Sequence, residues 1–278
     1  MSLPADIRRL DSGKHLVILL LLGAQLFPFY MLLQTSVKDN HQFLASPWTP
    51  PLPGKWHTEN FSYALKLVLP YVANTLFVAL VGTLGSLAAA LAGAYFFARH
   101  RGVLHRVCWA AFVLLLMMPT VMNIVPLFAQ LRDMGLLNSL WALILVGMAG
   151  TQAFNLYVLR AFVEEIPRDL FDAAQIDGAS HLAQILHVVL PMSLPILGTL
   201  GIVTFLGLWN DFLLPLLITR DAEKFTVGVG LVYLEGEYVK EWGRIMAAFL
   251  VASVPMVVLF LFTMKWFVRG IASGAIKG

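Results

Sequence analysis

The chain has 278 residues, of which 59% are hydrophobic and only 13% are charged, and its formal net charge is +3. An ordinary soluble domain carries about 25% charged residues, so this composition excludes a typical water-soluble protein and favours a membrane protein. The small net charge and scattered basic residues give little support for nucleic-acid binding. A single cysteine, Cys108, excludes an internal disulfide and a cysteine metal cluster.

Six apolar segments are long enough to cross a hydrocarbon core of about 30 Å, which requires about 20 helical residues each. They are expected near residues 16–37, 71–98, 107–129, 139–161, 188–218 and 245–268. The length of the first favours an uncleaved anchor over a secretory signal. The predicted fold class is therefore an all-α membrane protein, with a six-helix domain at residues 15–268 between an N-terminus at 1–14 and a tail at 269–278.

Basic residues in the connections indicate the orientation, because lysine and arginine are enriched in cytoplasmic loops. Arg99, Arg101 and Arg106 crowd the second connection, whereas the third has Arg132 alone. This asymmetry places both termini and the fourth connection, residues 164–191, in the cytoplasm.

Small residues and prolines give the segments their expected packing. Gly85, Ala89 and Gly93 follow helical spacing in the second segment, with Gly82 and Ser86 beside them, and favour close packing of helices within the chain. Prolines interrupt or kink helices because they lack a backbone donor. They occur in segments three, five and six, at Pro119, Pro126, Pro191, Pro195, Pro215 and Pro255. Such breaks suit a bundle that lines a cavity, although rigid bundles contain them too.

Polar side chains within the apolar segments are few, and they are candidates for a translocation path. The candidates are Asn123, Gln152, Asn155, Asn210 and Asp211. For the first three, hydrogen bonding between helices is the favoured alternative. For Asn210 and Asp211 the alternative, equally weighted, is capping or cross-linking of helices near the outer surface.

The fourth connection, residues 164–191, is polar and acidic and has helical periodicity. Pro167 and Asp169 suit a helix start, and Leu170, Ala173, Ala174 and Asp177 then share one face. Gly178 permits a left-handed turn, after which Leu182, Ile185, Leu186 and Val189 define a second face. Two short helices around a glycine hinge are therefore predicted. The five acids of this connection, against Arg168 and the preceding Arg160, disfavour docking on anionic lipid and favour a protein partner.

The motif at residues 172–191, DAAQIDGASHLAQILHVVLP, resembles the EAA loop of permease subunits in bacterial ATP-binding-cassette (ABC) importers. The matching positions are Asp172, Ala173, Ala174, Asp177, Gly178, Ala179, Leu190 and Pro191, although Asp172 replaces the usual Glu and Ile185 stands where Phe is common. The segments MPTVMNIVPLF, GLLNSLW and WNDFLLPLL resemble the carbohydrate branch. The C-terminal end of the chain resembles the tail of maltose-transporter permeases, which reaches toward the ATPase. The resemblance assigns this role to Gly274, Ala275, Ile276, Lys277 and Gly278.

This resemblance covers nearly the whole chain and implies the type I ABC importer permease fold, in the bacterial cytoplasmic (inner) membrane. It implies coupling helices in residues 164–191 that sit in a cleft of the ATPase. The implied partners are a second homologous permease, two ATPase subunits, an extracytoplasmic solute-binding protein and a sugar or oligosaccharide substrate. The implied mechanism is alternating access.

The sequence holds no phosphate-binding glycine loop, so the chain is not expected to hydrolyse ATP or to be an enzyme. It is expected to hold no cofactor or metal, and ATP and magnesium belong to the partner subunits. Two alternatives stay open. One is the same importer architecture for a non-sugar solute such as glycerol phosphate, and the other is a membrane enzyme or scaffold.

Overall fold

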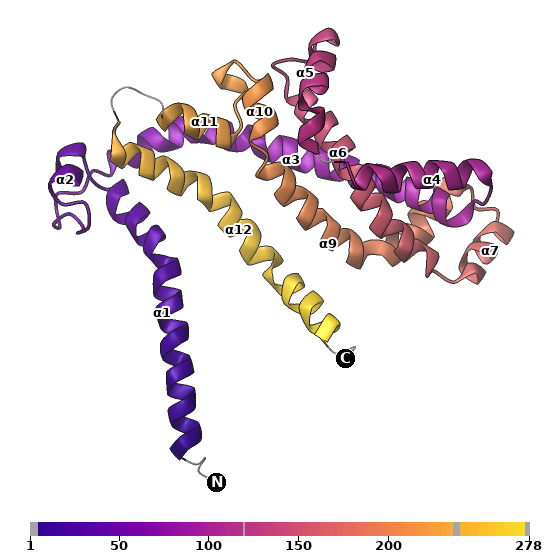
Figure 1. Ribbon diagram of the computed structural model, residues 1–278, viewed down its shortest axis with the longest axis horizontal. Coiled ribbons are helices and arrows are strands. Elements are labelled where there is room, and N and C mark those ends of the chain that lie inside the picture. The colour runs from indigo at the N-terminus through magenta and orange to yellow at the C-terminus, as the bar shows by residue number, and fades with distance from the viewer. Residues whose placement is uncertain (1–4, 119, 236–239, 276–278) are drawn as a thin grey trace. The chain divides into compact units, whose positions relative to one another are not determined.

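The computed structural model describes residues 5–118, 120–235 and 240–275, with side chains over 13–118, 122–234 and 240–264. Almost all of this part of the chain is helical, as the composition and the apolar segments predict (Figure 1). Short helices connect the long ones: α2 (Asn40–Ala45), α7 (Arg168–Ile176), η3 (Ala222–Lys224) and α11 (Val227–Glu235).

Five helical stretches among the described residues are long and apolar enough to cross a membrane. Four are the single helices α1 (Ala5–Ser36), α3 (Glu59–Arg99), α6 (Leu140–Glu164) and α12 (Trp242–Ala275). The other, His181–Ile218, joins α8 (His181–Gln184), the π-helical η2 (Ile185–Val189), α9 (Leu190–Trp209) and α10 (Leu213–Ile218). These stretches overlap five of the six predicted spans.

The third predicted span, residues 107–129, is not one spanning helix. It is divided into α4 (Val103–Leu116), η1 (Thr120–Asn123) and α5 (Ile124–Asp133). The 14 residues of α4 are about 21 Å long at 1.5 Å per residue, which is too short to cross the hydrocarbon core. The amides of Met117 and Met118 bond back three residues, which tightens and ends α4. Pro119, itself outside the described residues, disfavours helical backbone at the residue before it.

Contacts divide the chain into two compact units, and the first comprises Met1–Leu69 and Leu231–Val257. Its polar centre lies where α1 ends. Asn60 Nδ2 donates to the carbonyls of Ser36 and Lys38 at 2.9 and 2.8 Å, and buried Lys38 Nζ donates to Ser46 O at 2.7 Å. The burial lowers the pKa of the Lys38 ammonium group. The apolar side chains of α1 from Leu16 to Tyr30, by contrast, are exposed.

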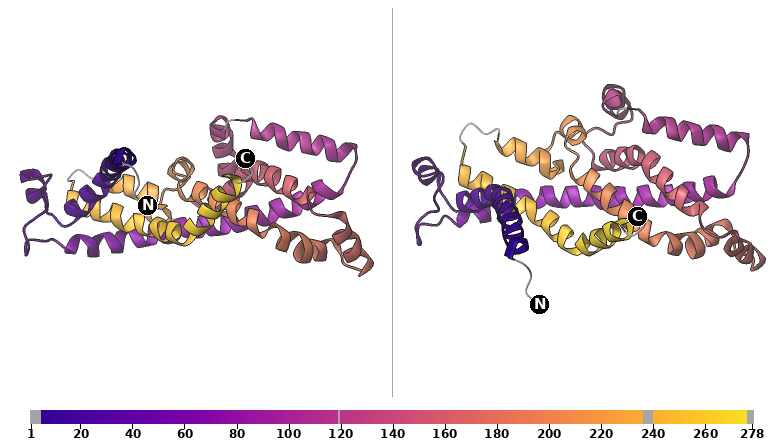
Figure 2. Two further views of the ribbon diagram at one scale, coloured as in Figure 1. Left: turned by 90° about the horizontal axis from the view of Figure 1, so that it is seen from below. Right: turned by 60° about the horizontal axis from the view of Figure 1, so that its bottom comes forward.

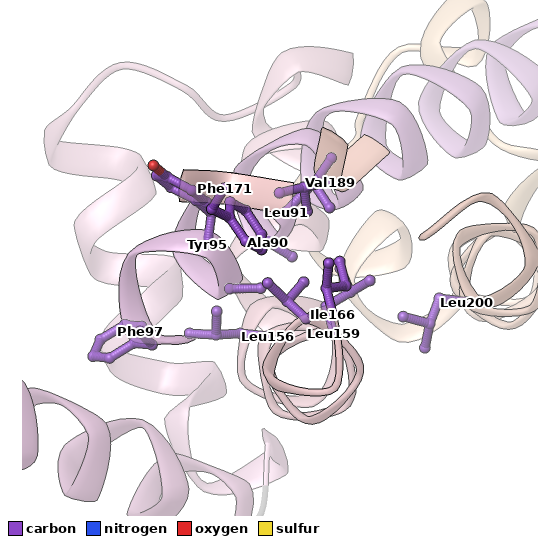
Figure 3. Close-up of a cluster of buried hydrophobic side chains, with 12 residues drawn as sticks. Ala90, Leu91, Tyr95, Phe97, Leu156, Leu159, Ile166, Phe171, Val189 and Leu200 are labelled. Carbon is purple, nitrogen blue, oxygen red and sulfur yellow. The ribbon is translucent and has the colours of Figure 1, made fainter. Parts of the chain in front are cut away.

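The second unit comprises Pro70–Gly230 and Val258–Gly278, and α6 packs there against both α9 and α4 (Figure 1, Figure 2). The small residues of α3 allow the close packing that the sequence predicts. A Cβ at Gly85 would lie 2.6 Å from Met148 Cε, and one at Gly93 would lie 2.9 Å from Leu156 Cδ1, both on α6. A buried apolar cluster joins α3, α6, α7 and α9 (Figure 3).

Candidate functional site

The 164–191 segment, called the coupling loop below, begins where α6 ends at Glu164. α7 (Arg168–Ile176) starts directly after Pro167 and carries Asp169 in its first turn, as predicted. The proline fits there because the first amides of a helix have no carbonyl within the helix to bond to. The acid is favourable at the positive end of the helix dipole.

Gly178 makes the turn that the sequence predicts. Its φ is +78°, in the left-handed region that favours glycine. The amide of Ala179 donates to Ala174 O at 2.9 Å and the amide of Gly178 to Gln175 O at 3.1 Å, so the last carbonyls of α7 are satisfied. Ser180 then caps the next helix by accepting from the Ala183 amide at 3.3 Å.

The prediction of a second separate short helix is wrong. α8 continues through η2 into α9, so the helix that starts at His181 is the N-terminal end of the fifth span. Pro191 lacks an amide hydrogen, and the π-helical turn Ile185–Val189 just before it changes the hydrogen-bond register, with the Leu190 amide bonded to Ile185 O. The predicted second face is only partly buried: Val189 is buried, while Leu182 and Leu186 are exposed.

Phe171 fixes α7 to α3, a role that no motif in the sequence indicates. Its side chain is 1% exposed and packs on Tyr95, with ring centroids 6.2 Å apart (Figure 3). The Arg99 guanidinium lies over the same ring at 4.1 Å, and Arg99 Nη2 is 3.9 Å from Asp172 Oδ1. Arginine stacking on an aromatic face adds attraction beyond area burial. The one signal in the sequence was that Phe171 is the largest apolar side chain of α7.

Tyr95 also fixes the far side of the glycine turn. Its hydroxyl donates to Gln184 Oε1 at 2.8 Å and lies 2.8 Å from His181 Nδ1. Gln184 is buried, and its Nε2 donates to Ala179 O at 3.2 Å. The two sides of the Gly178 turn are thus attached to one residue of α3, which holds α7 in a fixed direction relative to that helix.

The outer side of α7 is left open. Ile176 is 87% exposed and Leu170 is 43% exposed. Asp172, Ala173 and Asp177 are exposed as well. A surface with apolar side chains and acids side by side, on a short helix with rigid attachment, suits a protein partner.

Two of the predicted path residues, Gln152 and Asn155, belong to a buried polar cluster that joins α3, α6 and α9. Asn155 Nδ2 donates to Ser86 Oγ at 3.0 Å and to Thr204 Oγ1 at 3.1 Å, and Asn155 is fully buried. Gln152 Nε2 donates to Ser86 O at 2.9 Å. For Gln152 and Asn155 these contacts agree with the alternative to a path role, which was hydrogen bonding between helices.

Replacing Asn155 with leucine should lower the stability of the purified protein. The hydroxyls of Ser86 and Thr204 would lose a shared partner, at a cost of about 1–2 kcal/mol for a hydrogen-bonded group in a membrane bundle. The thermal unfolding midpoint measures this loss. Gln25→Leu on the exposed side of α1 is the matched control, and equal midpoints for the two variants would contradict the role of the cluster.

Asn210 and Asp211, two more of the predicted path residues, lie at a break in the fifth span. Asn210 ends α9 and donates from Nδ2 to Leu206 O at 2.8 Å, while Asp211 accepts backbone hydrogen bonds from Leu213 and Leu214 at the start of α10. Both therefore cap helices. Asp211 in addition lines a cavity of about 510 Å³, which is otherwise formed mainly by apolar side chains of α5, α6, α9 and α10. Asn123 is exposed between η1 and α5.

The predicted tail lies at the edge of the described residues. Gly274 and Ala275 end α12, and Ile276, Lys277 and Gly278 lie outside the described residues.

Comparison with known proteins gives consistent matches over nearly the whole chain. Residues 83–273 match the family described as binding-protein-dependent transport system inner membrane component. The chain is 32% identical to the trehalose/maltose transport system permease protein MalG of Thermococcus litoralis, covering 94% of this chain and 97% of that protein. It is 30% identical to the melibiose/raffinose/stachyose import permease protein MelC of Bacillus subtilis, covering 92% of each.

A solved structure shares the fold. It is described as a bacterial ABC transporter involved in the import of the acidic polysaccharide alginate, and it superposes with a TM-score of 0.81. The matched chain is 21% identical, and the match covers 96% of this chain and 99% of that one. The helical architecture described above is therefore shared with the matched chain of that transporter.

Proposed function

The chain belongs to the binding-protein-dependent transport system inner membrane component family as a carbohydrate ABC importer permease, and we propose that it moves its sugar by alternating access driven through the coupling loop. ATPase subunits bind the exposed side of α7. Closure of these subunits displaces α7, and the displacement tilts the fifth span and α3 between inward-facing and outward-facing states.

The rigid attachment of α7 to α3 is the observation that supports this mechanism best. Force that the ATPase applies to the loop reaches α3 through Phe171 and Tyr95. The proposed points of contact are Asp172, Ala173, Ala174, Asp177, Gly178 and Ala179. The same force reaches α9 through the continuous helix that starts at His181 and includes Leu190 and Pro191. A mobile loop would dissipate the motion, whereas packed side chains transmit it.

The proposed assembly has three kinds of protein partner. A second homologous permease completes the translocation path, two ATPase subunits hydrolyse ATP with magnesium, and an extracytoplasmic binding protein delivers the sugar. One solved relative, with a TM-score of 0.60, is described as an alginate ABC transporter in complex with a pentasaccharide-bound periplasmic protein. In this arrangement both termini and the coupling loop are cytoplasmic, and the tail that includes Gly274 and Ala275 contacts the ATPase.

Substrates named for the relatives favour a sugar or oligosaccharide as the cargo. They include trehalose and maltose, melibiose, raffinose and stachyose, and diacetylchitobiose. Reconstitution of the complete importer in proteoliposomes, with a panel of labelled sugars presented by the cognate binding protein, tests this proposal. ATP-dependent accumulation of a sugar supports it. Accumulation of glycerol phosphate but of no sugar would contradict the carbohydrate assignment, and nucleotide-independent catalysis would contradict transport.

The Asp211 cavity is the part of the translocation path that this chain contributes. Asp211→Asn should leave the capping of α10 intact, because asparagine caps helices as well as aspartate does, while removing the negative charge from the cavity. We expect assembly and thermal stability to be unchanged and the initial rate of sugar uptake to fall. Asp133→Asn, which removes an exposed negative charge at the end of α5 outside the cavity lining, is the control. An unchanged uptake rate for Asp211→Asn would remove Asp211 from the path.

A further inference from the structure

An arginine-lined pocket lies beside the coupling loop, within the second unit. Its volume is about 330 Å³, and its charged lining is Arg99, Arg101, Arg160 and Arg168 with one acid, Glu164. Two of these arginines come from the end of α3 and its connection to α4, and two come from α6 and the start of α7. Segments about 60 residues apart in the sequence thus combine their positive charge at one site.

The charge of this pocket is only partly neutralised. Arg160 forms an ion pair with Glu164 at 2.8 Å, and Arg99 is stacked on Phe171 near Asp172. Arg101 and Arg168 form no ion pair with a carboxylate of the described side chains. Two guanidinium groups with free donors facing one concave site form a receptor for an oxyanion, since arginine binds phosphate in a bidentate manner.

The surroundings place this pocket at the depth of lipid headgroups. Trp109 stacks with Tyr157, with ring centroids 6.0 Å apart and planes 11° apart, and the Arg160 guanidinium lies 3.9 Å from the Trp109 centroid. Tryptophan and tyrosine concentrate at the membrane interface, where the ring adjoins the acyl chains and the polar group faces the headgroups. Arg160, which contacts the Trp109 ring, also lines the pocket.

An apolar surface adjoins the pocket through α4. This helix begins one residue after Gly102, and its first turns expose Val103 at 69%, Leu104 at 76% and Val107 at 61%. A free phosphate ion makes no favourable contact with such an apolar surface, whereas the acyl chains of a phospholipid pack on it. The juxtaposition of an arginine pocket, an interfacial aromatic stack and an exposed apolar helix therefore favours a lipid.

We propose that this pocket binds the phosphate of an anionic phospholipid of the cytoplasmic leaflet, with the acyl chains along α4. Basic pockets between spans on the cytoplasmic side are the chemistry that recognises such headgroups. The charged residues of the coupling loop, when they are counted along the sequence, are mainly acidic and disfavour binding to anionic lipid. In the fold, Arg160 and Arg168 join Arg99 and Arg101 in the pocket, and among the described side chains Asp169 and Asp177 are absent from its lining. The bound phosphate bridges Arg101 to Arg168, and so links the end of α3 to α7.

The experiment compares lipid retention by the purified, fully assembled importer. Native mass spectrometry after exchange into phosphatidylglycerol or phosphatidylcholine counts the phospholipids that remain bound to wild type, to Arg101→Gln/Arg168→Gln and to Arg106→Gln. Arg106→Gln removes one charge from the same connection but lies outside the pocket lining. Arg101→Lys/Arg168→Lys keeps the charge and guards against a folding defect.

We expect wild type, Arg106→Gln and the double lysine variant to retain phosphatidylglycerol in preference to phosphatidylcholine. The double glutamine variant should lose that preference by roughly tenfold or more. Equal retention of both lipids by wild type, or an unchanged preference in the double glutamine variant, would overturn the proposal. Inorganic phosphate is the second probe. If it stabilises lipid-free wild type as much as phosphatidylglycerol does, the ligand is a free anion and the lipid is excluded. None of these readouts depends on sugar transport.

Discussion

Phe171→Ala is expected to uncouple ATP hydrolysis from sugar uptake. Truncating a buried phenylalanine costs about 3–5 kcal/mol, and here the lost contacts are those that attach α7 to Tyr95 and Arg99. A loss of that size lowers the ratio of attached to detached α7 by more than about a hundredfold. The ATPase subunits would then move α7 without moving α3. The measurement is the amount of sugar accumulated per ATP hydrolysed in proteoliposomes.

A matched variant separates coupling from stability. Phe205 is also buried, at 8% exposure, and stacks on Trp209 in α9, away from the coupling loop. Phe205→Ala should lower the unfolding midpoint comparably and leave the sugar-to-ATP ratio close to that of wild type. Phe171→Leu, which keeps much of the apolar volume, should restore most of the ratio. If Phe171→Ala and Phe205→Ala change the ratio equally, Phe171 has only a general structural role.

Gly178→Val should impair uptake for a different physical reason, the backbone conformation of the turn. A left-handed residue with a side chain costs about 1–2 kcal/mol, and β-branching makes the conformation worse. No atom lies within 4 Å of a Cβ built at Gly178, so the β-carbon itself meets no neighbour and the left-handed φ is the expected cause of the loss. We expect the uptake rate to fall by about tenfold at equal amounts of assembled complex.

Gly178→Asn tests whether the left-handed backbone conformation at position 178 is the cause. Asparagine tolerates the left-handed region better than other residues with side chains, although it is similar in volume to valine. Uptake by the asparagine variant should therefore exceed uptake by the valine variant. The opposite order, or equal uptake by both, would show that the partner interface senses side-chain bulk at this position and that backbone geometry is not the cause.

The helices and the glycine turn were predictable because their signals are local. Pro167, Asp169 and Gly178 each act on the backbone within one helical turn, and the structure has α7 and the left-handed turn where those residues place them. The small residues of α3 likewise indicated close packing. The helix beyond Gly178 was misassigned because the π-helical turn before Pro191 depends on how η2 joins a long span, which residue types alone do not specify.

The features that the sequence did not reveal are tertiary. Leu170 and Phe171 are adjacent apolar residues that point to different sides of α7, and only the position of Tyr95 decides that Phe171 is the buried one. The arginine pocket combines Arg101 with Arg168, which no motif connects. Asn155 carries the same polarity whether it faces a path or a neighbouring helix. Its bonds to Ser86 and Thr204 exist because three helices meet there.

Photo-cross-linking from Ile176 shows whether the ATPase binds α7. This residue is 87% exposed on the outer side of α7, where the ATPase is proposed to bind. A photoreactive amino acid at position 176 in the assembled importer should cross-link to the ATPase subunit, and the yield should change between the nucleotide-free and ATP-bound states. The same probe at Phe154, exposed in the middle of α6, should give no ATPase adduct. Cross-links from position 176 to lipid or to the second permease, with none to the ATPase, would contradict the coupling role of α7.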